Sequence, residues 1–195
     1  MRLYAHRFPE KVAGLVLTDG LHESGMLKMP IVLKALQLVF LSGFLVSIVG
    51  ASFGLIRVLR ALEIFELLKP ELRRIDPDRL SSMTRSFCRP KHWITMAREI
   101  WGLGESGVDV RTAKDLGDLP IVSIKSKSFF KPKLWTRLVP LKQIDRHRDQ
   151  MHEELLKLST RSQQFPASGS SHFVWIDEPE IIIAAVKEIL VRLTP

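Results

Sequence analysis

The residue best suited by type and position to catalytic chemistry is His172, which follows a run of small residues near the end of the chain. The run is Ser168-Gly169-Ser170-Ser171, and after His172 come an aromatic residue, an acidic pair, Pro179 and an apolar helical pattern from Ile181 to Leu193. Imidazole can take up and return a proton near neutral pH. His172 is therefore a candidate for proton transfer, although a histidine in such a turn also fits a simple cap.

A carboxylate, Asp19, follows a short apolar run near the start of the chain. The run Val12 to Leu17 is bounded by charged and turn residues, which predicts a strand buried on both faces of a parallel sheet. Asp19 then falls at the carboxyl end of that strand, the edge where open α/β sheets assemble their sites. An aspartate before Gly20 also caps turns, so both roles stay open.

A serine, Ser52, lies in a pentad that matches the G-x-S-x-G pattern. That pattern marks the nucleophile elbow, in which a serine is exposed on a sharp turn between a strand and a helix. Residues 44–49 as a strand and 55–65 as a helix would supply this context. The same pentad, residues 50–54, also matches G-x-x-x-G, a close-packing pattern of apolar helices.

Both ends of the chain resemble the α/β-hydrolase fold family. The segment around His172 is similar to the catalytic-histidine turn of that family, and residues 2–20 are similar to the helix, x-Pro break and buried strand that follow its nucleophile elbow. The resemblance implies an α/β fold class: an incomplete α/β-hydrolase fold with the back half of a mostly parallel sheet and a helical cap insertion. The nucleophile would then precede Met1, and Ser52 comes too late in this order, as a decoy would.

The resemblance also implies catalytic roles. Acyl transfer in this family uses a nucleophile, a histidine that takes and returns its proton, and a carboxylate that orients the imidazole. His172 would be the base and Asp19 the acid. After the second strand, residues 125–128 contain no carboxylate, which departs from the family's commoner pattern. Asp145 and Asp149 are the alternatives for the acid.

The order of predicted elements divides the chain into a core and an insertion. The core is residues 1–20 and 116–195, and the insertion is a helical cap at 21–115 with an apolar segment at 31–65. Further strands are expected at Ile121 to Ile124 and Ser162 to Phe165, with an amphipathic helix at Met151 to Leu158. Within the cap, Asp76 before Pro77 predicts a helix start.

Residues 35–56 carry no charge, and Lys34 and Arg57 flank them. This length suits a transmembrane helix. Interspersed serine and glycine residues favour instead a lid helix or a helix that lies in a membrane interface. Both readings stay open.

The composition predicts a folded, intracellular protein. Of 195 residues, 46% are hydrophobic and 26% charged, which is typical of a globular chain. The single cysteine, Cys88, cannot form an internal disulfide and is expected to be a buried structural thiol. The first residues predict a helix and a strand rather than a secretory signal peptide. We therefore expect a cytoplasmic location, with membrane association as an alternative.

The net charge of +8 is concentrated in a basic stretch, residues 125–148. It is either a solvated face or a surface for anionic lipid. Interleaved aromatic residues suit a membrane interface better than base stacking, and no nucleic-acid motif accompanies them, so no nucleic-acid partner is expected. The basic and aromatic residues are Lys125, Lys127, Lys131, Lys133, Arg137, Lys142, Arg146 and Arg148, with Phe129, Phe130 and Trp135.

No metal site and no cofactor are expected. His22 lies near Asp19 and Glu23, but no further histidine or cysteine cluster supports a metal. His147 and His152 lie five residues apart, a poor match to the spacing that puts two ligands on one helical face. A glycine-rich phosphate loop is also missing from the sequence.

Three functional hypotheses follow. In the first, the chain is an ester or acyl-bond hydrolase for a lipophilic small molecule, here without its nucleophile segment and inactive alone. In the second, it is a noncatalytic membrane or interaction module that uses the helix at 35–56, the basic stretch and an exposed sheet edge. In the third, it is an active hydrolase with Ser52 as nucleophile.

Overall fold

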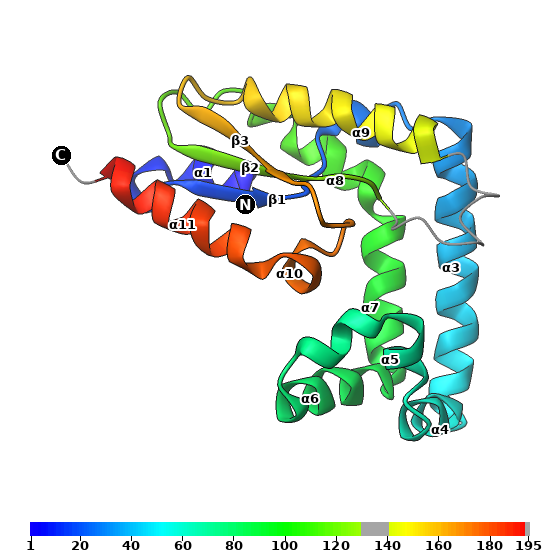
Figure 1. The fold of residues 1–195 in the computed structure, drawn as a ribbon. Helices are drawn as coiled ribbons and strands as arrows, with labels where there is room; N and C mark the ends of the chain where they lie inside the picture. Colours follow the sequence, from blue (N-terminus) through cyan, green and yellow to red (C-terminus); the bar gives the residue numbers. More distant parts are fainter. Residues whose placement is uncertain (130–140, 194–195) are drawn as a thin grey trace. The chain divides into compact units, whose positions relative to one another are not determined.

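The computed structural model describes residues 1–129 and 141–193 (Figure 1). The chain divides into two compact units, residues 1–29 with 104–195, and residues 30–103. The first unit is larger than the predicted core, because α2 (Glu23–Leu27) packs against α9 (Leu141–Leu156). The residues of the basic stretch that lie outside the described part are Phe130, Lys131, Lys133, Trp135 and Arg137.

A small parallel sheet forms the centre of the first unit. In the described part of the chain, its strands are β1 (Leu15–Thr18), β2 (Ile121–Ser126) and β3 (Ser162–Ala167), in the order β1-β2-β3. Both pairings are parallel, with Leu15 opposite Ile121 and Ile121 opposite Ser162. The fold is therefore mixed α/β, and strands lie at all three predicted places, although the first begins at Leu15 rather than at Val12.

Helices cover both faces of this sheet (Figure 1). Alternate side chains of β2 point to opposite faces, as a strand requires. Val122 and Ile124 pack with Ile189 of α11 (Pro179–Leu193), whereas Ile121 packs with Leu155 of α9. Most of the buried core of this unit lies in these two clusters.

The prediction that β1 is buried on both faces is confirmed in part, because Val16 packs with one core cluster and Leu15 and Leu17 with the other, but the burial is incomplete. Only Leu15 is fully buried, and the other three residues are half-buried. The reason is the position of β1 at one edge of the described sheet, where the central strand β2 separates it from β3.

The first helix is joined to the rest of the unit by a buried arginine. Arg2 begins α1 (Arg2–Arg7), which η1 (Pro9–Lys11) links to β1. Its guanidinium donates to Glu23 at 2.6 Å and to the carbonyl of Ala113 at 2.8 Å. Ala113 follows α8 (Leu103–Asp109) and η3 (Val110–Thr112), so this one side chain connects three segments.

The second unit is helical. Its core contains Ala51, Ile56 and the buried thiol of Cys88, which pack with aromatic residues such as Phe87. The side chain of Asp76 accepts hydrogen bonds from two backbone amides, which confirms the predicted helix start. The elements are α3 (Ile31–Ser52), α4 (Leu55–Ala61), α5 (Ile64–Leu68), η2 (Pro70–Arg74), α6 (Pro77–Phe87) and α7 (Pro90–Trp101).

The helix α3 is continuous for 22 residues, so the strand considered at 44–49 is absent. One face of α3 packs along α7. Gln37 donates to the carbonyl of Ile100 at 2.7 Å, and the rings of Phe44 and Trp93 lie 6.1 Å apart. This contact continues along several turns, which explains why helical structure extends through the apolar stretch.

Gly14, directly before β1, lies where α11 packs closely on the sheet, so a substitution there can test this packing. A Cβ at Gly14 would lie 2.5 Å from Cγ2 of Ile189 and 3.1 Å from the carbonyl oxygen of Pro120. Gly14→Ala is therefore expected to lower the free energy of unfolding by about 1–3 kcal/mol. Urea denaturation followed by circular dichroism measures the change.

Gly104, in α8 of the same unit, is the matched control. A Cβ there would meet no atom within 4 Å. Gly104→Ala should raise the free energy of unfolding slightly, by about 0.5–1 kcal/mol, because alanine loses less backbone entropy in a helix. If both variants behaved alike, the close approach of α11 at Gly14 would be contradicted.

Candidate functional site

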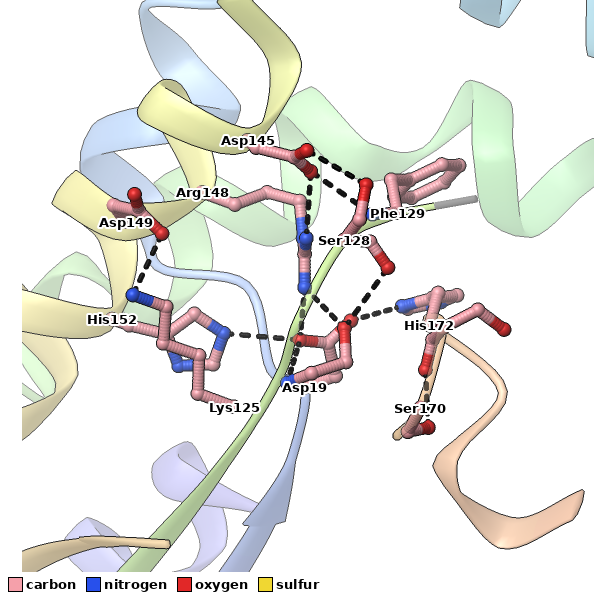
Figure 2. Close-up of polar contacts among 12 residues, drawn as sticks. Asp19, Lys125, Ser128, Phe129, Asp145, Arg148, Asp149, His152, Ser170 and His172 are labelled. Atoms are coloured by element: carbon pink, nitrogen blue, oxygen red, sulfur yellow. Dashed lines mark hydrogen bonds and ion pairs between the residues drawn. The ribbon is translucent and has the colours of Figure 1, made fainter. Parts of the chain in front are cut away.

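Asp19 lies at the centre of the candidate site, at the carboxyl end of β1. Its backbone has a left-handed φ of 46°, which aspartate tolerates better than most residues. Its amide still donates to the carbonyl of Ile124 at 2.8 Å, so the turn begins directly at the end of the pairing with β2. The side chain is completely buried, and other elements surround it (Figure 2).

Both carboxylate oxygens of Asp19 are used. Oδ2 accepts from Nδ1 of His172 at 2.6 Å. Oδ1 accepts from Nε2 of His152 at 3.1 Å, from the amide of Ser126 at 3.2 Å and from the guanidinium of Arg148. These partners come from the end of β2, from α9 and from the loop after β3, so one carboxylate connects the segments at this edge of the sheet.

The partners keep Asp19 ionised. Burial would raise the pKa of its carboxyl group, but hydrogen bonds from His152 and His172 and the positive charge of Arg148 hold the pKa well below its usual range. An ionised carboxylate can only accept hydrogen bonds. Nδ1 of His172 therefore carries a proton, so in the neutral imidazole the lone pair that a base needs lies on Nε2.

The turn that carries His172 is fixed from both sides. Asp177 accepts from the amide and the hydroxyl of Ser171, at 2.9 and 2.6 Å. The amide of Lys127 donates to the carbonyl of Ser170 at 3.2 Å, which joins the turn to the end of β2. The imidazole is thus held from its own backbone as well as from Asp19.

His172 also has an accessible side. Its side chain is 39% exposed, whereas that of His152 is 1% exposed. Phe129 stacks on the imidazole with ring centres 5.0 Å apart, and Phe173 meets it edge-on at 5.8 Å. Among the residues described, none forms a hydrogen bond with Nε2, and the side chain as a whole lies partly exposed between aromatic neighbours.

His152, the second histidine bonded to Asp19, lies in a different environment. Nε2 of His152 donates to Asp19, and its Nδ1 lies 3.2 Å from the hydroxyl of Ser123, which donates to it when the ring is neutral. Serine, histidine and aspartate are therefore in line, but Ser123 lies inside β2 with no exposed surface. No substrate can reach this serine, so the line is a structural hydrogen-bond chain.

Sequence reasoning missed Arg148 and His152. On α9 they share a face with the buried Ile144, Met151 and Leu155. An arginine in the middle of an apolar helical face is unusual unless a carboxylate pairs with it. That pattern was the signal. Arg148 was instead counted in a basic stretch expected to be either a solvated face or a surface for anionic lipid, and its burial contradicts both.

The two alternative acids occupy different places on α9. Asp145 borders the site, where it accepts from Arg148 at 3.1 Å, from the hydroxyl of Ser128 at 2.7 Å and from the amide of Phe129 at 3.0 Å. Asp149 is half exposed and pairs with Lys125 at 2.7 Å. Asp145 thus positions Phe129, which stacks on His172, and neither carboxylate is bonded to the imidazole.

The serines around the pair donate their hydroxyl protons elsewhere. Ser126 donates to the carbonyl of Ser128 at 3.3 Å, and Ser170 donates to the carbonyl of Ser171 at 2.6 Å. The hydroxyls of Ser128 and Ser171 donate to Asp145 and Asp177. In the described part of the chain, no serine close to the pair is therefore aligned with Nε2 of His172.

Ser52 lies in the other unit, at the last residue of α3. Its hydroxyl donates to the carbonyl of Ile48 at 2.9 Å, one helical turn earlier. The strand that an elbow needs before the serine is replaced by helix, although Gly54 has the left-handed φ of 81° that a sharp turn uses. The turn here ends one helix and begins the next.

No group of three or more His, Cys, Asp or Glu side chains that could hold a metal ion is found within the described residues. His22 contacts Glu23 at 3.2 Å, but Arg2 occupies the same carboxylate oxygen at 2.6 Å. A cation would therefore compete with a buried guanidinium at this place.

Removal of the charge on Asp19 should destabilise the protein strongly. Asp19→Asn leaves the buried guanidinium of Arg148 without its counter-charge, and loss of one partner of a buried ion pair costs about 3–5 kcal/mol. Asp149→Asn is the matched control, because its pair with Lys125 is half exposed and contributes about 0–1 kcal/mol. Equal effects in urea denaturation would contradict the buried pair.

The low pKa of Asp19 should also make the free energy of unfolding depend on pH. In the native state the carboxylate stays ionised in acid, whereas in the unfolded chain it takes up a proton at about pH 4. The unfolded state thus binds more protons, and the free energy of unfolding should fall as the pH drops below about 4. Urea midpoints at a series of pH values should show a shallower slope for Asp19→Asn, and an unchanged slope would refute this.

Comparisons with models of protein families, with curated proteins and with solved structures find no match to this chain. The chemical interpretation of the site therefore depends on its geometry.

Proposed function

We propose that Asp19 and His172 are the acid and base of an acyl-transfer site, and that the chain is part of an α/β-hydrolase that cleaves an ester or related acyl bond. The observation that supports this most strongly is the 2.6 Å contact between a fully buried, ionised carboxylate and Nδ1 of a partly exposed histidine. A pair of this kind orients an imidazole and stabilises its protonated form.

The chemistry assigned to the pair is proton transfer. Nε2 of His172 accepts the proton of an attacking hydroxyl, while the oxygen of that hydroxyl forms a bond to the acyl carbon. The imidazolium is stabilised by Asp19 and then returns the proton to the leaving oxygen as its bond to carbon breaks. General acid-base catalysis of this kind contributes about 10²–10⁴-fold to a rate.

The surroundings of His172 favour an apolar acyl group. Phe129 and Phe173 lie on two sides of the imidazole, and Trp175 close by is half exposed. Aromatic surface next to the reacting atoms can take up a hydrocarbon chain from water. We therefore propose a lipophilic small-molecule substrate.

The nucleophile is proposed to lie outside residues 1–195. The serines close to the pair donate elsewhere, and the order of segments in α/β-hydrolases places the nucleophile before the helix that matches residues 2–7. A preceding segment or a separate chain would supply it. In this proposal the chain contributes the acid and the base of a triad.

The base can be tested without the nucleophile, with an activated ester. Without its nucleophile the chain is expected to be inactive on ordinary esters, but it should hydrolyse the activated ester p-nitrophenyl acetate slowly, because an oriented imidazole can activate water as a general base. His172→Ala should lower this rate to the background that the other exposed histidines and the lysines give. His6→Ala is the matched control, since His6 is an exposed histidine of the same unit. A rate that His172→Ala leaves intact would refute the base.

The hypothesis that Ser52 is the nucleophile has its own test. A fluorophosphonate probe labels serines that an adjacent base activates, and the labelled peptide can be mapped by mass spectrometry. We expect no labelling of Ser52, because its hydroxyl is bonded to the carbonyl of Ile48. Labelling of Ser52 that His172→Ala abolishes would show that the chain is a complete hydrolase and would contradict the external nucleophile.

A further inference from the structure

We propose that the outer face of α3 lies on the surface of an anionic membrane. This interaction site is independent of the acid-base pair, because α3 belongs to the unit formed by residues 30–103 and the pair belongs to the other. It can therefore fail or hold without any effect on the proposed catalytic role.

The first observation is an exposed apolar stripe on α3. Its residues recur at intervals of three, four and seven, which places them on one side of the helix. Their side chains are 57–87% exposed. They are Ile31, Leu38, Val39, Leu45, Val46, Val49 and, directly after the helix, Phe53. A continuous apolar surface of this kind marks a place of contact with a partner or a membrane.

The second observation separates a surface position from a transmembrane one. The opposite face of α3 packs along α7, and α7 carries the exposed charges of Lys91, Arg98 and Glu99. Insertion of α3 across a bilayer with α7 attached would bring these charges into hydrocarbon, which is costly. Although α3 has the length and composition of a membrane span, only its outer face is free to enter lipid.

The third observation is the sign of the charge around the stripe. From residue 31 to residue 62 the chain contains no acidic residue, while Lys34 and Arg57 lie exposed near the two ends of α3. The whole unit contains eleven basic and six acidic residues. Basic residues beside an apolar face are attracted by anionic headgroups, so this arrangement favours an anionic lipid surface over a neutral one or an acidic-rimmed partner.

The polar side chains on this face do not oppose burial in lipid. Ser42, in the middle of the stripe, donates to the carbonyl of Leu38 at 2.9 Å, and Ser52 donates to that of Ile48 at the same distance. Both hydroxyls are thus satisfied within the helix and need no water. The outer face can leave water without an unpaired donor.

Vesicle flotation tests the proposal with the whole chain. Phosphatidylcholine vesicles with phosphatidylserine should carry the protein to the top of the gradient, pure phosphatidylcholine vesicles should carry much less, and added salt should weaken binding. Val46→Asp should lower the partition coefficient about tenfold or more, since it removes apolar contact and adds repulsion. Phe53→Ser should act in the same direction without a change of charge.

Ile183→Asp is the matched control, because Ile183 is an exposed apolar residue of α11 in the other unit. Circular dichroism verifies that each variant is folded. Unchanged binding of Val46→Asp and Phe53→Ser, or no binding to either vesicle, would overturn the proposal. Binding that resists both salt and alkaline extraction would show a span instead, and a dimer that Val46→Asp separates would show that the stripe faces a second copy.

Discussion

The buried negative charge of Asp19 is the constraint on which the site depends. A carboxylate without exposed surface is tolerated only when charged and hydrogen-bonded partners replace water, and here they come from the end of β2, from α9 and from the turn after β3. Arg148 supplies the compensating charge. The ion pair therefore explains why an arginine lies within the apolar face that α9 packs on the sheet, and why the segments at this edge converge on one carboxylate.

The two histidines of Asp19 show how the environment separates chemical roles. Each donates one ring proton to the same carboxylate, yet His152 is enclosed with Ser123 inside the sheet, whereas His172 has an exposed side between aromatic rings. By its hydrogen bonds alone, the buried series Ser123–His152–Asp19 would be described as a catalytic triad. Access to substrate decides otherwise, because a base that no reactant reaches can only support structure. His152 holds Oδ1 so that Oδ2 remains aligned with His172.

The sequence predicted the parts of the fold that depend on local pattern. The strands β2 and β3, the capped start of α6 and the positions of Asp19 and His172 each follow from a few neighbouring residues. Long-range contacts could not be predicted in this way. The incomplete burial of β1 depends on its edge position, and the role of Arg148 depends on a carboxylate 129 residues away. The local pattern, an arginine within the apolar face of α9, indicates a buried charge but does not identify its partner.

The apolar stretch shows why a motif must be judged by the element that carries it. In G-x-S-x-G the serine reacts because a strand ends and the backbone turns sharply beneath it. Around Ser52 the preceding residues are helical, since one face of that helix packs on α7, and the helix in turn gives the serine a carbonyl acceptor. The same helical geometry places Leu38, Val46 and Val49 together on the outer side. One structural fact, continuous helix through residue 52, therefore removes the support for a nucleophile there and creates the surface proposed to meet a membrane.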